Sequence, residues 1–469
     1  MGKKAKRNQP KTQDKDPPPS VEPTPPHSST PTHPKALPIA DNTGRMATVL
    51  LILAAWLFAS FLRLHWVQEA HLPGKANTYQ INGELLPTTH DSYLFGSIIQ
   101  KGHLGMHSGN PEVPAPHEHG PITWLPVILL NWFNGPAFHD LTEAADEFGQ
   151  TSQHLSSSIA TEDDNSTKGK LLANSLKDAQ AMRAMLLGIH PTPHHLKENA
   201  RSAAEAARKT AQTLHSAGYN DKAVHAALAS AQDHALSAIR RPMISVESVM
   251  AYMPAFAASL LAVPLVLIGR LLGSTWWGFL AALTGSVAYS YYNRSMSGYF
   301  DTDMFSVTVP AVALYFLLRS LCNKEDWSAG AGAVALFLMP FFYTSSMSIA
   351  LAMAVAYIGY QLVFHWREAR AWEGIVPVAV AMFFLGGSQG HVIAVNPVAW
   401  VLKIATIVCT SLAPRWMPWL RVESERPGWP LRAGVAAMLV GVVLFSSPFE
   451  RVRQKVFQYL PAETAAANP

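Results

Sequence analysis

The sequence predicts an all-α polytopic membrane protein with about nine transmembrane helices and a helical insertion in the first external loop. Two observations of composition support this class: 49% of the 469 residues are hydrophobic, and only 14% are charged. Soluble domains carry about 25% charged residues. The third observation is a series of apolar runs, because about 20 residues at 1.5 Å each cross a hydrocarbon layer of roughly 30 Å as a helix.

Residues 1–45 form a basic and Pro-rich tail that includes Lys3, Lys4, Lys6 and Arg7. Such a composition cannot bury a core, so we expect a disordered tail. Basic residues before a first apolar run favour the cytoplasmic side of a membrane. The tail is therefore predicted to be cytoplasmic, and the region 46–133 is predicted to hold the first crossing and the start of the first external loop.

The predicted crossings lie at 46–66, 248–268, 276–292, 304–321, 329–343, 348–364, 375–388, 393–412 and 433–445. Arg270, Arg319, Arg367 and Arg415 then fall at cytoplasmic ends, as the positive-inside rule requires. Crossings two to nine occupy 242–447, and 448–469 is expected to begin a later external loop.

An Ala-rich polar stretch at 134–241 contains no apolar run of spanning length. Ala, Lys, Glu, Gln and Arg favour helices, and Gly218, Tyr219 and Asn220 are expected to interrupt them. We predict a helical periplasmic insertion within the first external loop.

A polar motif, YYNRSMSGYFDTDM, separates two of the apolar runs at 291–304. Its charged residues are Arg294, Asp301 and Asp303. In an extended segment, side chains two residues apart project to the same side, so both carboxylates could reach one ligand. A divalent cation would relieve their repulsion, and oxygen donors favour Mg²⁺ or Mn²⁺. The alternative is a solvated turn or a helix cap.

The run NRSMSGYFDTDM resembles the second acidic motif of the membrane-bound oligosaccharyltransferases, in particular the bacterial single-subunit type. The first acidic motif of that family follows the first transmembrane helix, and His90-Asp91-Ser92-Tyr93 matches it in position and pattern. The likeness extends from about Met46 to the C-terminus, apart from the insertion. It implies a GT-C-like glycosyltransferase membrane domain.

The resemblance also implies an activity and its residues. These enzymes transfer a glycan from polyprenyl pyrophosphate to the Asn amide of Asn-x-Ser/Thr acceptors, with inversion and with a divalent metal. Asp91, Asp301 and Arg294 would be catalytic, and Asp91, Asp301 and Asp303 would hold Mn²⁺ or Mg²⁺. Asp303 could instead pair with Arg294, and Arg294 could instead anchor a lipid headgroup.

The implied partners are a polyprenyl-pyrophosphate-linked glycan, an acceptor polypeptide and membrane lipid, without nucleic acid. The implied location is the bacterial inner membrane, with the N-terminus cytoplasmic and the active site facing the periplasm. The family's late external acid and its Trp-Trp-Asp motif have no counterpart before Pro469. We therefore expect a fragment, an inactive remnant, or half of a split enzyme that a second chain completes.

Two other functions fit the same pattern. One is another polyprenyl-phosphate-dependent glycosyltransferase, such as a protein O-mannosyltransferase, which also places an acid in its first external loop. The other is a non-catalytic subunit that binds or transports lipid-linked glycan.

Overall fold

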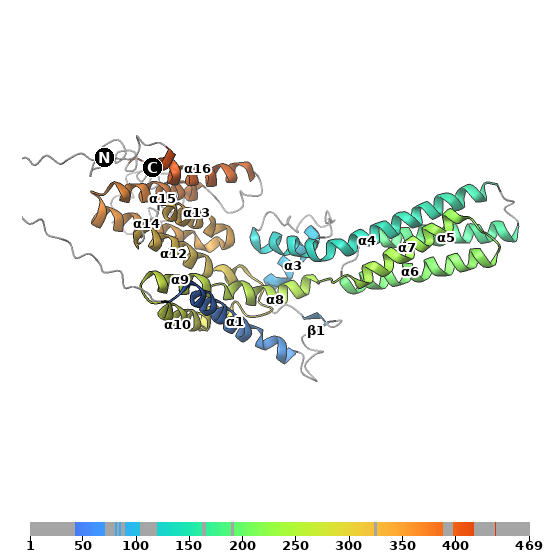
Figure 1. The fold of residues 1–469 in the computed structure, drawn as a ribbon, viewed down its shortest axis with the longest axis horizontal. Helices are drawn as coiled ribbons and strands as arrows, with labels where there is room; N and C mark the ends of the chain where they lie inside the picture. The colour runs from blue at the N-terminus through green and yellow to red at the C-terminus, as the bar shows by residue number, and fades with distance from the viewer. Residues whose placement is uncertain are drawn as a thin grey trace, which may run out of the picture. The chain divides into compact units, whose positions relative to one another are not determined.

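A computed structural model of the chain is almost entirely helical in the part that it describes (Figure 1). The described residues are 43–70, 80–81, 84–85, 90–103, 120–161, 166–188, 192–322, 326–387, 397–416 and 437. Residues 1–42, most of the predicted crossing at 433–445 and the segment 448–469 lie outside them.

The described elements, in chain order, are α1 (Arg45–Ala70), β1 (Gln80–Ile81), β2 (Glu84–Leu85), α3 (His90–His103), α4 (Pro121–Ile159), α5 (Thr167–Leu186), α6 (Pro193–Ser216), α7 (Lys222–Arg240), α8 (Val246–Ser259), α9 (Ala262–Leu271), α10 (Thr275–Ser286), α11 (Tyr289–Asn293), the 3₁₀ turn η2 (Thr302–Phe305), α12 (Thr308–Cys322), α13 (Asp326–Phe342), the 3₁₀ turn η3 (Thr344–Ser346), α14 (Met347–His365), α15 (Ala369–Gly387) and α16 (Pro397–Trp416). The two short strands pair antiparallel, with Gln80 opposite Leu85.

Four helical segments among the described residues are long and apolar enough to cross a membrane. They are Arg45–His65, Val246–Leu271, Thr302–Cys322 and Met347–His365. Two shorter apolar helices lie at Trp327–Phe342 and Val398–Leu412. The prediction of a helical, multi-pass membrane protein is confirmed. The count of nine crossings is not.

One predicted crossing is divided in two. The run 276–292 was expected to be a single helix, but α10 ends at Ser286 and α11 begins at Tyr289. Ala288 between them has a non-helical backbone (φ −55°, ψ 119°). The 12 residues of α10 span about 18 Å, which is well short of a hydrocarbon layer of roughly 30 Å.

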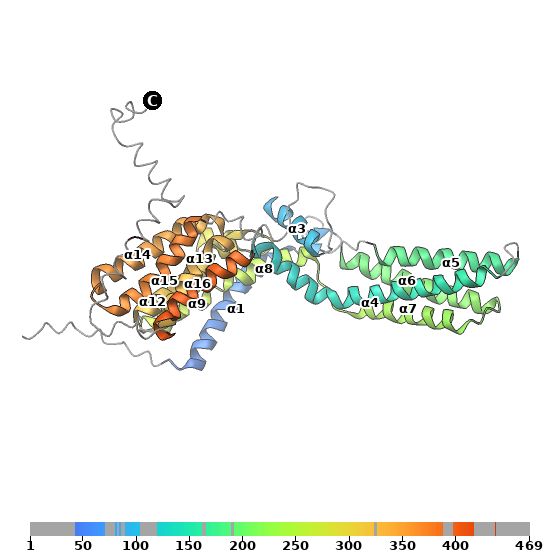
Figure 2. The same cartoon turned by 90° about the horizontal axis from the view of Figure 1, so that it is seen from above.

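The insertion is a bundle of α4, α5, α6 and α7, which lie side by side in both views (Figures 1 and 2). Its buried alanines recur every three or four residues, as at Ala227, Ala231 and Ala235 on α7, so that one face of each helix is apolar. The predicted break is confirmed, because α6 ends at Ser216 and Gly218 adopts a positive φ of 76°.

Side-chain caps begin three of the four bundle helices. Ser166 accepts from the Gly169 amide at α5, Thr192 caps α6, and Asp221 accepts from the Ala223 amide at α7. Each cap satisfies a backbone N–H that has no partner within its helix.

α4 belongs to both parts of the protein. Its beginning, including Ile122 and Leu130, packs with α3 and α8, whereas its residues from Ala137 onwards pack in the bundle. The insertion therefore begins in the middle of a continuous helix and not at a helix end.

The chain enters and leaves the bundle at one junction. Asn134 on α4 donates to the Ile244 carbonyl and accepts from the Ile244 amide, both at 2.9 Å. His103 at the end of α3 contacts Asn134 at 3.2 Å and Asn131 at 2.7 Å. Burial lowers the pKa of His103, although the contact with Asn131 opposes the shift. These contacts join α3, α4 and the start of α8.

Asp140 provides a pH-dependent test of the bundle. Its carboxylate accepts hydrogen bonds from Ser237 Oγ at 2.7 Å and Arg241 Nε at 3.1 Å. Burial alone would raise the pKa of Asp140, but these two hydrogen bonds and the Arg241 charge lower it below its ordinary 3.8. A lowered pKa means that the stabilisation is present above pH 3.8 and is lost as the pH falls through the lowered value.

We expect Asp140→Ala to reduce the local opening free energy of α4 and α7 by about 1–3 kcal/mol at pH 7. This difference should vanish as the pH falls below the lowered pKa. Amide hydrogen exchange, corrected for intrinsic rates, measures it, with the exposed Asp178→Ala on α5 as the control. An equal effect at both ends of the pH range would contradict the assignment.

Candidate functional site

The charged motif forms a loop between α11 and α12. We call residues 294–303 the acidic loop. Gly298 makes its turn with φ of 81°, a conformation that L side chains rarely adopt. The Gly298 amide donates to the Ala251 carbonyl of α8 at 3.0 Å, and Ser297 Oγ donates to the same carbonyl at 2.5 Å. The loop is thus fixed to α8 through a backbone amide and a serine hydroxyl that share one carbonyl.

A second attachment connects the loop to α3. Ser92 Oγ donates to the Phe300 carbonyl at 3.1 Å and accepts from the Phe300 amide at 3.1 Å. Ser92 follows Asp91 in the first turn of α3, and Phe300 precedes Asp301. Asp91 and Asp301 are 210 positions apart in the chain, but their immediate neighbours are hydrogen-bonded to each other. The two acidic motifs therefore lie close together.

Asp301 and Asp303 lie in different backbone conformations, which corrects an expectation from the sequence. Asp301 is extended (φ −150°, ψ 164°), but Asp303 lies in the 3₁₀ turn η2. The geometry that points residues i and i+2 to one side therefore does not apply. The Asp301 carboxylate caps η2, since it accepts from the amide of Thr302 and from its hydroxyl at 3.1 Å.

Asp303 forms an ion pair with Arg294. The Arg294 Nη1 to Asp303 Oδ2 distance is 3.1 Å, with the Asp303 side chain 10% exposed and that of Arg294 60% exposed. The Asp303 charge raises the pKa of Arg294. This is the pairing that the sequence raised as an alternative role for Asp303, and it leaves the charge of a nearly buried carboxylate balanced within the loop.

The predicted metal site has an oxygen-only donor set that suits Mg²⁺ or Mn²⁺. Among the side chains that the structure describes, no three His, Cys, Asp or Glu residues are grouped to hold a metal. The Asp91 side chain lies outside the described part, so the three-carboxylate arrangement stays a prediction.

Tyr291 connects the loop to the helices on either side, and sequence reasoning missed this role. Its hydroxyl lies 3.0 Å from the Ala258 carbonyl, 3.1 Å from the Met304 carbonyl and 2.9 Å from Thr308 Oγ1. The residue ties α11 to α8 and α12. The only signal in the sequence was its place at the start of the polar motif.

Contacts at the two ends of α1 show which segments share a side. Near the beginning of α1, Thr48 Oγ1 accepts from Arg270 Nη1 at 2.6 Å. Near the other end, the Leu62 and Arg63 carbonyls accept from Tyr292 and Ser297. The acidic loop therefore lies at the end of α1 that leads toward Asp91, and Arg270 lies at the opposite end.

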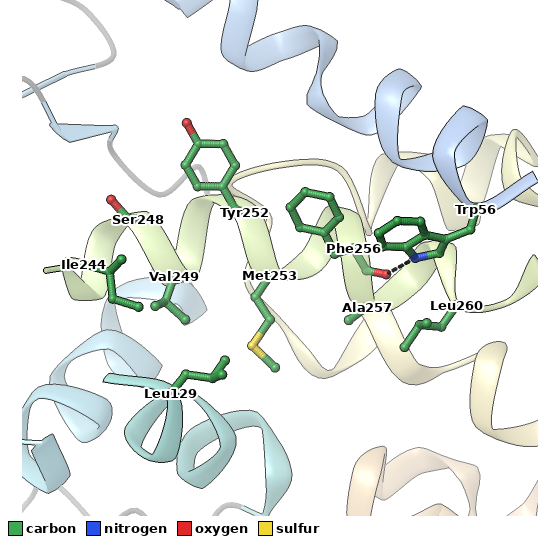
Figure 3. Close-up of a pocket in the computed structure, with 10 residues that line it drawn as sticks. All are labelled: Trp56, Leu129, Ile244, Ser248, Val249, Tyr252, Met253, Phe256, Ala257 and Leu260. Atoms are coloured by element: carbon green, nitrogen blue, oxygen red, sulfur yellow. Dashed lines mark hydrogen bonds between the residues drawn. The ribbon is translucent and has the colours of Figure 1, made fainter. Parts of the chain in front are cut away.

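An apolar groove of about 400 Å³ lies beside α8 (Figure 3). Its walls come from α1, the start of α4 and α8, and the Trp56 indole donates to the Phe256 carbonyl at 3.3 Å. None of its lining side chains is charged; they include Leu129, Met253 and Leu260. The groove suits hydrocarbon and offers nothing for transfer chemistry.

Comparison with known proteins identifies the segment that carries the loop. Residues 223–414 match the family model described as oligosaccharyl transferase STT3, N-terminal. This segment is similar to the N-terminal part of the STT3 oligosaccharyltransferases. A 164-residue part of the chain is also 34% identical to the undecaprenyl-diphosphooligosaccharide–protein glycotransferase of Campylobacter jejuni serotype O:2. The protein of that name from C. jejuni strain RM1221 aligns equally well.

The match to these oligosaccharyltransferases is partial. The aligned part is 35% of this chain and covers 21% of the relatives' length. Arg294, Asp301 and Asp303 fall inside the STT3 segment, whereas Asp91 and helices α4 to α6 precede it. The placement of Asp91 beside the STT3 segment depends on the contact between Ser92 and Phe300.

Ser92 gives a direct test of the connection between α3 and the acidic loop. Ser92→Ala removes both hydrogen bonds and leaves the buried Phe300 amide unpaired, which costs about 1–3 kcal/mol. We expect hydrogen exchange across the acidic loop to accelerate by about 5- to 150-fold. Ser97→Ala is the matched control, because among the described residues the Ser97 hydroxyl bonds to the Tyr93 carbonyl of the same helix and to no other segment. Loop exchange that is the same in both variants would rule out the connection.

Proposed function

We propose that the protein acts as a membrane oligosaccharyltransferase. It would transfer a glycan from a polyprenyl pyrophosphate carrier to the Asn amide of Asn-x-Ser/Thr acceptors, with inversion at the anomeric carbon. The observation that supports this most strongly is the double hydrogen bond between Ser92 and Phe300, since it brings the first acidic motif to the acidic loop of an STT3 segment. The similar Campylobacter proteins are named for transfer from an undecaprenyl diphosphooligosaccharide to protein.

The reaction needs a better nucleophile than an ordinary amide. Resonance with the carbonyl delocalises the nitrogen lone pair, and the same resonance keeps peptide groups planar. A carboxylate that accepts hydrogen bonds from the Asn NH₂ group would hold it twisted and expose the lone pair. Asp91 is our candidate for this role. The nitrogen would then form a bond to the anomeric carbon as the carbon–oxygen bond to pyrophosphate breaks, and the Asp91 carboxylate would accept the proton that the nitrogen loses.

The departing pyrophosphate gains negative charge, which cations stabilise. A bound Mn²⁺ or Mg²⁺, held by Asp91 and Asp301, would supply Lewis-acid stabilisation there. Asp303 is the third candidate ligand, but its pairing with Arg294 favours an orienting role. Arg294 keeps 60% of its side chain exposed while Asp303 holds it, so its guanidinium can meet an anionic leaving group.

The topology follows from the same proposal. The N-terminal tail would be cytoplasmic, and the acidic loop would face the periplasm or exterior of a bacterial inner membrane. The proposed partners are the lipid-linked glycan, the acceptor polypeptide and surrounding lipid, with a second chain as a candidate source of further site residues.

Mutation of the two leading acids tests the activity. We expect Asp91→Asn and Asp301→Ala each to lower peptide glycosylation about 100-fold or more and to abolish its response to Mn²⁺. Transfer of labelled glycan to an Asn-x-Thr peptide in membranes containing the protein is the measurement. Asp178→Asn on α5 makes the same change of charge at an exposed position and should keep wild-type activity.

Three outcomes would contradict the proposal. Transfer to a peptide hydroxyl and not to Asn would indicate an O-glycosyltransferase. Binding of lipid-linked glycan without any transfer would indicate a binding or transport subunit. Normal activity in a variant that combines Asp91→Asn with Asp301→Ala would show that the site residues are wrongly assigned.

A further inference from the structure

One charged side chain of α1 lies entirely inside the protein. The buried face of the helix repeats every four residues through Ala55, Ala59, Arg63 and Val67, and Arg63 is 0% exposed. Small residues at Ala55 and Ala59 allow neighbouring helices to approach closely. A buried arginine in an apolar helix is costly, and such residues usually serve a function.

The guanidinium donates to three acceptors on three segments. Arg63 Nη1 bonds to the Ala59 carbonyl at 3.2 Å, Nη2 to the Ser286 carbonyl at 2.9 Å, and Nε to Ser295 Oγ at 3.0 Å. It also lies over the rings of Tyr291 and Tyr292, at 5.3 and 5.8 Å from their centroids. No carboxylate of the described residues pairs with the guanidinium, so its charge is stabilised by neutral hydrogen-bond acceptors and aromatic rings.

Each acceptor explains part of the arrangement. Ser286 ends α10, and a carbonyl at a helix C-terminus lacks a partner within its helix and carries partial negative charge. Ser295 Oγ accepts from Arg63 and donates to the Tyr291 carbonyl at 2.5 Å. The Arg63 side chain therefore bonds to the C-terminus of α10 directly and contacts α11 through Ser295.

Two backbone carbonyls of α1, beside the Arg63 side chain, also hold the acidic loop. The Arg63 carbonyl accepts from the Ser297 amide at 3.1 Å, and the Leu62 carbonyl accepts from the Tyr292 hydroxyl at 3.0 Å. Arg294 lies between these contacts in the chain. The chain on both sides of Arg294 is therefore held against α1.

We propose that Arg63 is a positioning residue for the acidic loop. It fixes residues 286–297 against α1, so that Arg294 and the η2 turn with Asp301 and Asp303 keep one orientation. The inference deepens the proposed function and rests on it for the part that concerns metal and transfer. Lysine cannot replace Arg63, since its single ammonium cannot span the three acceptors or stack on the tyrosine rings.

The test compares Arg63→Lys and Arg63→Met with a control substitution at a second arginine, Arg270. Arg270→Met removes a contact between an arginine and α1 at the opposite end of that helix. Ser295→Ala is a milder variant that removes one Arg63 contact and remains usable if Arg63→Met does not fold. Hydrogen exchange of the acidic loop in metal-free protein and Mn²⁺ binding followed by electron paramagnetic resonance are the two readouts.

We expect loop exchange at least tenfold faster in both Arg63 variants, and smaller effects in Ser295→Ala. Mn²⁺ should bind about 10- to 100-fold more weakly in the Arg63 variants, as when groups that orient metal ligands are lost. Arg270→Met should match wild type in both readouts.

Loop exchange that Arg63→Met and Arg63→Lys leave unchanged would overturn the proposal. Faster exchange with unchanged Mn²⁺ affinity would also overturn it, because Arg63 would then serve only stability. If the wild-type protein neither binds Mn²⁺ nor transfers glycan, the proposed function is wrong, and loop exchange alone decides whether Arg63 positions the loop.

Discussion

A loop that carries three charged residues can lie between apolar helices only if its backbone polar groups find partners there. Unpaired N–H and C=O groups away from water are costly, and more so near lipid. In this protein α1, α3 and α8 supply those partners: Ser297 bonds to α1, Phe300 to α3 and Gly298 to α8. The position of Asp301 follows from these bonds, since Asp301 lies next to Phe300. Arg294 lies next to Ser295, which accepts a hydrogen bond from Arg63 of α1.

The same constraint accounts for the charges. Asp303 is almost buried and is compensated by Arg294, whereas Arg63 is fully buried and is compensated by carbonyl oxygens and aromatic rings. A salt bridge on one side of the loop and a network of neutral acceptors on the other give it a defined orientation. Such an arrangement suits a site in which charge develops during reaction, because preorganised groups do not have to reorient.

The sequence predicts the helical membrane fold and the helical insertion well, since apolar runs and helix-forming composition are local properties. It also predicts the break at Gly218, because glycine favours the positive φ found there. It fails at 276–292, where hydropathy is continuous but the helix ends at Ser286. The hydrogen bonds of Tyr291 and Arg63 hold the chain there in a different path.

In the candidate site too, some features can be predicted from the sequence and others cannot. The acidic motifs are visible as residue patterns, but the relation between Asp301 and Asp303 depends on the 3₁₀ turn, which the sequence does not indicate. The partner of Ser92 lies 208 positions away, and the acceptors of Arg63 include carbonyls that every residue has. Only the arginine itself, inside the apolar run 46–66, gave a signal that sequence reasoning could have used.

The central claim is that the two acidic motifs meet at one end of α1, and a cysteine pair tests it most directly. In a variant without Cys322 and Cys409, Asp91→Cys and Asp301→Cys are combined with a protease site in the α4–α5 connection. After oxidation and cleavage, the account predicts that the two fragments stay linked until a reductant is added, whereas a control pair at Asp91 and Leu314 separates. Fragments that separate without reductant, although both cysteines still react with a maleimide, would show that the motifs do not form one site.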